Sequence, residues 1–168
     1  MIANKASGEK WKLRDSELVD LDPLMSWFPT RQDVEVWGGP EFRFPFTLAS
    51  FREDIRWDHL DSFSLEGRDG RLAAFGQIYR RKGRTHLARL VVCPELRSRG
   101  VGKCLIEMLM SEGRRRHGSK EFSLFVFREN IPALRCYESM GFIVCDYPPD
   151  MPHGDVCYFL VWRDGDNR

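Results

Sequence analysis

Apolar residues recur at helical spacing in four segments of the chain. Intervals of three and four residues place apolar side chains on one face of an α-helix, which makes 3.6 residues per turn. Ser16, Thr47 and Pro132 stand where helices would begin, and Gly118 and Gly141 stand where helices would end. The pattern predicts helices over residues 17–27, 48–57, 101–117 and 132–140.

Shorter runs rich in valine, leucine, phenylalanine and tyrosine predict strands. Charged turns at 67–70 and 80–84 separate three of these runs, so the strands there should form an antiparallel meander. Gly76 interrupts the middle strand and predicts a bulge. Strands and helices in mixed order predict an α/β fold. The predicted strands are 11–14, 63–66, 72–79, 85–92, 121–127, 142–145 and 156–162.

The stretch from Trp37 to Phe46 is rich in aromatic residues and is interrupted by glycine and proline, which break regular structure. Two interpretations are open. Its aromatic side chains either cover one face of the predicted sheet or line a substrate pocket.

The 168 residues fit one domain, and no linker, repeat or low-complexity segment divides them. We therefore predict a single domain over residues 1–168. No apolar run approaches the ~20 residues that span a bilayer, which predicts no membrane partner. The N-terminus lacks the apolar core of a secretory signal, which predicts a cytoplasmic location.

Charge and cysteine usage narrow the function classes. A net charge of +1 creates no field that would attract nucleic acid. The basic cluster at 114–117 either complements a helix dipole or contacts nucleic acid, and the dipole needs no partner, so we predict no nucleic acid. Five cysteines without paired spacing predict reduced thiols and no metal. Cys104 is either a core residue beside Leu105 or a nucleophile near a helix start.

The candidate chemistry begins in the loop between the strand ending at Val92 and the next helix, Arg97-Ser98-Arg99-Gly100-Val101-Gly102-Lys103. Its glycines bring backbone N–H groups close to a ligand, and the first turn of a helix offers unpaired donors and positive dipole charge. Its cationic side chains make a phosphate or pyrophosphate the expected ligand. The spacing differs from that of a Walker loop and of the dinucleotide fingerprint.

This loop, read as Arg97-x-x-Gly100-x-Gly102, resembles the pyrophosphate loop of the GNAT acetyltransferase superfamily. The sequence resembles a second signature of the superfamily one predicted helix and one predicted strand later. This second match is Asn130-x-x-Ala133-x-x-x-Tyr137-x-x-x-Gly141-Phe142. The resemblance covers residues 85–162. It implies the GNAT fold, which is mixed α/β with a mostly antiparallel central sheet split around acetyl-CoA and flanked by helices.

The resemblance implies acetyl-CoA as the cofactor, with CoA as the product, between the strands 85–92 and 121–127. The pantetheine arm is then expected to pair with the backbone of Leu90-Val91-Val92, as an added strand would. The pyrophosphate is expected on residues 98–103. Asn130 resembles the residue that hydrogen-bonds the arm.

Tyr137 resembles the residue that reaches the thioester sulfur, and its spacing from Ala133 also fits a half-buried helix tyrosine. As a phenol with an ordinary pKa near ~10, it would donate a hydrogen bond or a proton to the departing thiolate. A backbone N–H near Val91 or Val92 is expected to meet the charge on the thioester oxygen.

The acceptor amine must be neutral to react. For a pKa of ~10.4, deprotonation at pH 7 costs about 4.6 kcal/mol at 1.36 kcal/mol per unit, so a general base is useful. Several GNAT enzymes place a glutamate on one of the two strands beside the cofactor, and here one such position is Phe125. Near the other is His86, either a catalytic base or a solvated strand-end residue. We expect His86 to share a face with Ala88, Leu90 and Val92.

Alternative bases are Glu129, His153 and Asp155. The resemblance implies an acetyl-CoA-dependent N-acetyltransferase acting on a primary amine, either a small molecule or an amino group of a peptide or protein, such as a peptide N-terminus. Because the glutamate is missing, a non-catalytic acyl-CoA-binding sensor or interaction module is the alternative. The acceptor, the base, the preferred acyl group and the oligomeric state stay open, and a homodimer is compatible with the resemblance.

Overall fold

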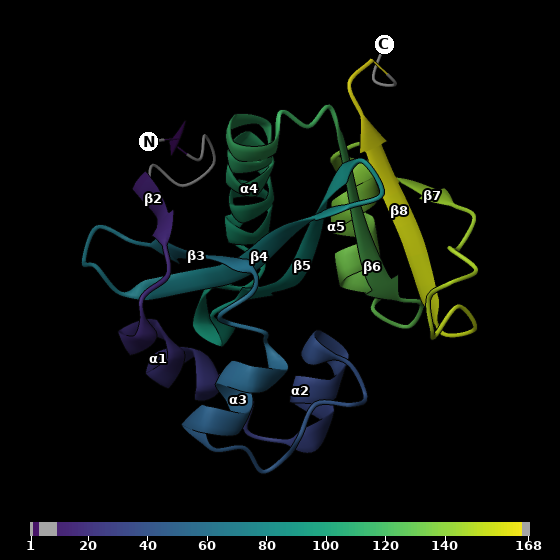
Figure 1. Cartoon of the computed structure of the whole chain (residues 1–168). Helices are drawn as coiled ribbons and strands as arrows, with labels where there is room; N and C mark the ends of the chain where they lie inside the picture. Colours follow the sequence, from purple (N-terminus) through teal and green to yellow (C-terminus); the bar gives the residue numbers. More distant parts are fainter. Residues whose placement is uncertain (1, 4–9, 166–168) are drawn as a thin grey trace.

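A computed structural model describes residues 2–3 and 10–165 of the chain (Figure 1). The strands are β1 (Ile2–Ala3), β2 (Lys10–Asp15), β3 (Asp61–Glu66), β4 (Leu72–Arg81), β5 (Arg84–Val92), β6 (Glu121–Phe127), β7 (Ile143–Cys145) and β8 (Cys157–Arg163). They form one sheet in the order β1-β2-β3-β4-β5-β6-β8-β7. Neighbouring strands are antiparallel except β5 and β6, which are parallel. This is the mixed, mostly antiparallel sheet that was predicted.

Helices cover both faces of the sheet (Figure 1). On one face lie α4 (Val101–His117) and α5 (Ile131–Ser139). On the other lie α1 (Leu21–Met25), α2 (Arg31–Gly38) and α3 (Leu48–Asp54). Two short 3-10 turns, η1 (Leu18–Asp20) and η2 (Pro94–Leu96), precede α1 and follow β5. We call the two sides of the sheet the α4 face and the α3 face.

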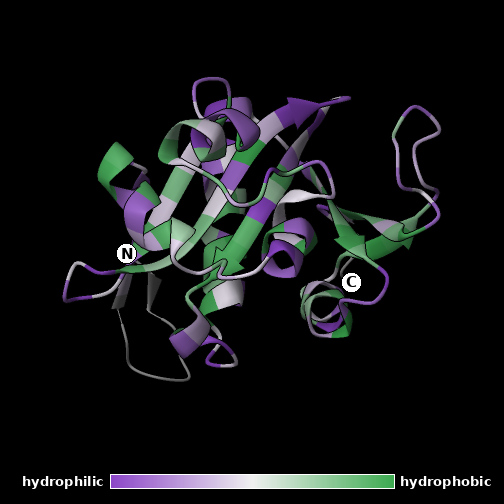
Figure 2. Cartoon of the chain, turned by 90° about the horizontal axis from the view of Figure 1, so that it is seen from below, coloured by the Kyte–Doolittle hydropathy of each residue, from purple (hydrophilic) through white to green (hydrophobic). Residues whose placement is uncertain are grey.

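The sheet separates two hydrophobic cores. On the α4 face, Leu105 and Leu109 of α4 pack against strand residues such as Leu65, Ile78 and Leu87. Side chains of one strand alternate between the two faces, so the neighbouring positions supply the other core. Seen from below, hydrophobic residues run along the strands, whereas the turns and the loop between β7 and β8 are mainly hydrophilic (Figure 2). Among the described helices, none combines the length and apolar character that crossing a bilayer requires.

The aromatic stretch 37–46 contributes to the core on the α3 face. Phe42 is buried, and Trp37, Phe44 and Phe46 are partly buried against the same cluster. The ring centroids of Trp37 and Phe51 lie 5.8 Å apart in a stacked arrangement. These contacts favour the interpretation in which the stretch covers the sheet.

Two helix predictions need correction, and one helix was missed. Ser16 caps no helix, because its hydroxyl bonds Ser64 and the first cap is Glu17. Pro23 lacks an amide hydrogen, and the segment predicted as one helix over 17–27 divides into η1 and α1. The pattern also missed α2, whose short apolar stripe buries Val34 alone.

The bulge predicted at Gly76 lies instead on β5. Phe75 is opposite Val91 and Gln77 is opposite Ala88, so the extra residue belongs to β5. Arg89 takes a left-handed backbone conformation there, with φ of 49°. Gly76 serves close packing, because a Cβ at this position would lie 2.7 Å from Leu109 Cδ1.

Candidate active site

The parallel strands β5 and β6 form a fork. They are paired at two positions, Thr85 opposite Phe122 and His86 opposite Ser123. Beyond His86, β5 stays paired with β4 and β6 stays paired with β8, and within the described residues β5 and β6 are not paired again. Strand edges that face each other without pairing offer backbone N–H and C=O groups to an extended ligand.

Alternation along β5 decides which backbone groups face the fork. Cys93 donates its amide to the Ala73 carbonyl of β4 at 2.8 Å. Because successive residues of a strand point their amides to opposite edges, the amide of Val92 faces the open edge. The Val92 carbonyl accepts a hydrogen bond from Nε of Arg97 at 3.4 Å. Of the two amides considered from the sequence, Val92 is therefore the one available in the fork.

The predicted anion loop leads from the open end of the fork into α4. Gly100 occupies the N-cap position with φ of 80°, and Ser98 is also left-handed with φ of 61°. The first intrahelical hydrogen bond runs from the Cys104 amide to the Gly100 carbonyl, and no side chain caps this helix. Within the described part of the chain, the amides of residues 101–103 therefore have no acceptor and are available donors at the positive end of the helix dipole.

The start of α4 has the properties of a binding site for a phosphate-bearing cofactor. An uncapped helix start with three free amides is a site for an anion, and the exposed side chains of Arg97 and Lys103 add positive charge beside it. A cavity of about 370 Å³ lies between α4 and α5 and is lined in part by Lys103 and Met140. The residues present fit the pyrophosphate end of CoA.

Asn130 and Tyr137 both lie on α5. Asn130 is the N-cap of this helix, where its Oδ1 accepts a hydrogen bond from the Ala133 amide at 3.4 Å. That contact leaves its side-chain NH₂ group as a donor. The Tyr137 ring packs at an angle against Phe142, and within the described chain its hydroxyl makes no hydrogen bond. Burial raises the pKa of Tyr137, which keeps the phenol protonated at neutral pH.

His86 faces away from Leu90 and Val92, contrary to the shared face predicted from alternation. Leu90 and Val92 pack into the core on the α4 face, whereas the His86 ring lies 5.1 Å from Tyr79 and 4.9 Å from Phe125. The bulge at Arg89 causes the difference, since one extra residue reverses the alternation beyond it.

Burial changes the chemistry of His86. The side chain is 2% exposed and its Nδ1 is hydrogen-bonded to Ser123 Oγ at 2.9 Å. Burial, with a contribution from Arg81, lowers the pKa of His86 from 6.5 to about 3. A neutral imidazole with this pKa is a weak base, which argues against the predicted role of His86 as the general base.

The partly exposed rings of Tyr79, Phe125 and Tyr147 form a surface on the α3 face beside the fork. These residues belong to neither hydrophobic core. The sequence did not indicate this grouping, because the three residues come from β4, β6 and the loop before β8. The alternative bases lie on loops, Glu129 after β6 and both His153 and Asp155 before β8.

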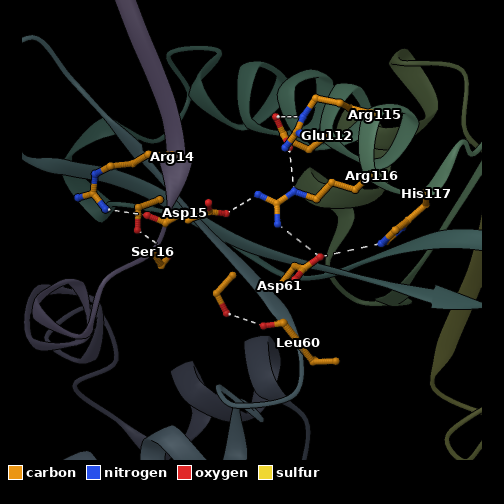
Figure 3. A network of polar contacts seen from close by, with 11 residues as sticks. Arg14, Asp15, Ser16, Leu60, Asp61, Glu112, Arg115, Arg116 and His117 are labelled. Carbon is orange, nitrogen blue, oxygen red and sulfur yellow. Dashed lines mark hydrogen bonds and ion pairs between the residues drawn. The ribbon is translucent and has the colours of Figure 1, made fainter.

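The basic cluster 114–117 ends α4, and Arg115 and Arg116 of this cluster are paired with carboxylates (Figure 3). Arg116 lies 2.5 Å from Asp15 and 3.0 Å from Glu112, and Arg115 lies 2.6 Å from Glu112. In these pairs, carboxylates of the same chain compensate the positive charges of Arg115 and Arg116. The pairs favour the structural interpretation of the cluster over contact with nucleic acid.

Cys104 lies in the core on the α4 face and is 4% exposed. Burial raises the pKa of its thiol, which disfavours the thiolate that a nucleophile requires. A cavity of about 810 Å³ lies between α1, the β3–β4 turn and η2, and none of the residues predicted for the site lines it.

The chain matches the model of the acetyltransferase (GNAT) family over residues 31–142. It therefore belongs to the GNAT acetyltransferase family. This family is a class of acyltransferases with acetyl-CoA as the acetyl donor.

Individual proteins that resemble this chain share a limited fraction of its sequence. A mycothiol acetyltransferase of Acidimicrobium ferrooxidans is 28% identical over 143 residues, which are 82% of this chain and 43% of that protein. The chain thus spans less than half the length of this curated relative.

Two solved structures illustrate the shared fold. The ribosomal-protein-S18-alanine N-acetyltransferase of Escherichia coli has a TM-score of 0.64 and 22% identity, with 92% of this chain and 94% of that chain covered. The spermidine N-acetyltransferase of Vibrio cholerae, in complex with CoA and spermine, has a TM-score of 0.71 and 18% identity, with 91% and 95% covered. These likenesses confirm the predicted GNAT fold.

Proposed function

We propose that the protein transfers the acetyl group of acetyl-CoA to a primary amine. The observation that carries this proposal is the fork between β5 and β6, whose open end leads to the uncapped start of α4. Bound acetyl-CoA supplies a thioester, from which the amine nitrogen takes the acetyl group to form an amide while the carbon–sulfur bond breaks.

The donor side of the site is built from backbone groups. The amides of residues 101–103 and the ammonium of Lys103 would hold the phosphates at the start of α4. The open edge of β5 over residues 90–92 would bind the extended arm as an added strand does. The free NH₂ group of Asn130 offers one more donor beside the fork.

Two groups would act on the reacting atoms. The Val92 amide, which points to the open edge, would stabilise negative charge on the thioester oxygen. The Tyr137 hydroxyl would donate a hydrogen bond to the departing sulfur and stabilise it as a thiolate, which takes its proton from solvent when CoA leaves. The raised pKa of Tyr137 keeps the hydroxyl protonated, so that it remains a donor.

The acceptor must lose a proton before it reacts, and His86 is too weak a base to take it at pH 7. The α3 face carries the positive charges of Arg81 and Arg89 near the fork. Nearby positive charge lowers the pKa of an ammonium group, so more of the acceptor is neutral there than in bulk water. We infer that solvent water accepts the proton.

Amine-dependent release of CoA thiol tests the proposal. The purified protein is mixed with acetyl-CoA and with a panel of small primary amines and short peptides, and the acetylated amine is identified by mass spectrometry. We expect one acetylated amine for each thiol released. Binding of CoA with no release on any amine would contradict the transfer and would favour the acyl-CoA-binding sensor.

A further inference from the structure

The charges of three arginines act on Tyr79, which lies on the α3 face. Arg81 follows on the same strand, Arg89 occupies the β5 bulge and Arg56 follows α3. Burial raises the pKa of Tyr79, and the positive charges of Arg81, Arg89 and Arg56 act in the opposite direction. Side chains two residues apart on a strand share a face, so Arg81 lies on the face of Tyr79. Arg89 reaches that face through its bond to Gln77. We call Tyr79 and the three arginines the cationic surface.

Arg81 is largely buried and has unused hydrogen-bond donors. Its side chain is 12% exposed, and its guanidinium carbon lies 5.3 Å from the centre of the Phe125 ring. Asp150 is 4.0 Å away but is held by Lys82 at 2.6 Å, and within the described chain the Arg81 guanidinium makes no hydrogen bond. An arginine fork in such a partly desolvated place forms strong charge-assisted bonds with an anion.

Among the described residues, the Arg89 guanidinium donates hydrogen bonds only to neutral oxygens. It donates to Gln77 Oε1 and to the Asp54 carbonyl, both at 3.0 Å, while its Nε is buried without a partner. No carboxylate of the described residues lies within 4.0 Å of Arg89, although the charge of Asp54 acts on it from farther away. Burying a cation costs solvation energy, and here no close carboxylate offsets that cost. The positive charge of Arg89 is therefore uncompensated and can attract an anionic ligand.

The other two members of the cationic surface have side chains without polar partners among the described residues. Arg56 is exposed and has a left-handed backbone with φ of 54°, and its side chain makes no ion pair or hydrogen bond in the part of the chain that the structure describes. The Tyr79 hydroxyl likewise makes none among these residues. The surface thus presents guanidinium groups and a phenol, which all donate hydrogen bonds.

The cationic surface adjoins the fork. Tyr79 contacts His86, and His86 contacts Phe125, with ring centroids 5.1 Å and 4.9 Å apart. His86 belongs to the last pair before β5 and β6 separate. Because α4 and α5 occupy the opposite face, an amine that reaches the fork from the α3 face passes beside this surface.

We infer that the acceptor carries an anionic group, a carboxylate or a phosphate, which the cationic surface binds while the amine of the same molecule enters the fork. This inference rests on the proposed acetyl transfer and names its substrate class. An acceptor that is a short amino acid or an amino-alkyl phosphate has this chemistry, whereas a diamine would meet repulsion from three arginines.

Acceptors matched in length test the inference. β-Alanine, β-alaninamide and 1,3-diaminopropane have similar lengths and carry an anionic, a neutral and a cationic group, respectively, at the end remote from the amine. 2-Aminoethyl phosphate and its neutral match ethanolamine test a phosphate. We expect kcat/KM for an anionic member to exceed that for its neutral match by about tenfold or more, the scale of a charge-assisted hydrogen bond. Equal or faster reaction of the neutral amines or the diamine would overturn the inference while leaving acetyl transfer intact. The faster of the two anionic compounds identifies a carboxylate or a phosphate.

Variants separate binding of the anion from folding. Arg81→Gln and, independently, Arg56→Gln should remove most of the preference for the anionic acceptor over its neutral match, because the charged contact is lost. Arg68→Gln removes the same charge from an exposed turn and is the matched control. Preference that survives in both test variants would contradict the assignment.

Calorimetry gives a readout without turnover. β-Alanine or 2-aminoethyl phosphate is titrated into the CoA-saturated protein and into Arg81→Gln. We expect binding of one of them that Arg81→Gln weakens by about tenfold, again the scale of one charge-assisted bond. If no amine released thiol, the proposed transfer would fail, and this titration would still decide the inference: no binding of either anion to the natural protein overturns it.

Discussion

His86 and Ser123 form the last pair between β5 and β6, with His86 Nδ1 and Ser123 Oγ 2.9 Å apart and both side chains buried. Beyond this pair the strands separate. The hydrogen bond therefore closes the base of the fork that we propose to hold the donor.

Removing the hydroxyl of Ser123 should destabilise the fold. In Ser123→Ala the buried ring nitrogen of His86 loses its partner, so we expect the free energy of unfolding to fall by about 1–3 kcal/mol. Urea denaturation measures the change. Ser139→Ala, an exposed serine whose hydroxyl bonds the Cys136 carbonyl, is the control and should change stability by less than about 0.5 kcal/mol. Equal stability of Ser123→Ala and the natural protein would contradict the role of the pair.

The low pKa of His86 predicts a pH dependence. Burial lowers this pKa from 6.5 to about 3, so between these values the unfolded chain binds a proton that the folded chain does not. The stabilisation is complete above pH 6.5 and is lost as the pH falls toward 3. Between pH 7 and pH 5, the natural protein should lose more stability than His86→Gln, measured by urea unfolding at each pH. Parallel pH profiles of the two proteins would refute the assignment.

The left-handed glycine at the start of α4 allows a matched test of the anion site. Gly100→Ala and Gly83→Ala both place a methyl group at a residue with φ near 80°, so each should cost about 1–2 kcal/mol of stability. Only Gly100 lies in the loop that precedes the free amides of α4. We expect the dissociation constant of CoA, measured by calorimetry, to rise about tenfold in Gly100→Ala and to stay unchanged in Gly83→Ala. Equal CoA affinity of the two variants would argue against this loop as the phosphate site.

Tyr137→Phe should slow the chemical step. Loss of a positioned hydrogen-bond donor typically lowers kcat by about 10²-fold or more, and the ring that packs on Phe142 is retained. Stopped-flow or steady-state thiol release on the acceptor found in the panel gives kcat, and calorimetry gives CoA affinity, which should stay within about twofold because the phosphate site is untouched. An unchanged kcat would show that Tyr137 is not the donor.

Much of the fold follows from local sequence. The strand over 121–127 and the long helix from Val101 were predicted at their observed bounds, because their apolar patterns are long and regular. The short α2 was missed for lack of such a pattern. Thr30 and Asp33 form a capping box at its start, and this was the signal that could have revealed it.

Candidate site residues could be predicted from the sequence only where they are neighbours in the chain. The anion loop joins a strand to the following helix, so its glycines and cations are adjacent in the chain. The bulge at Arg89 has no local signal, since an arginine rarely adopts positive φ, and it reversed the predicted facing of His86. The cationic surface unites Arg56, Arg81 and Tyr79 from segments that only the folded sheet brings together.

A crystal structure of the protein with CoA tests the central claim most directly. We predict the pyrophosphate on the amides of residues 101–103 and the arm between β5 and β6, beside Val92 and Tyr137. CoA bound at another surface, or density confined to the cavity beside η2 with the fork left unfilled, would contradict this account of the site.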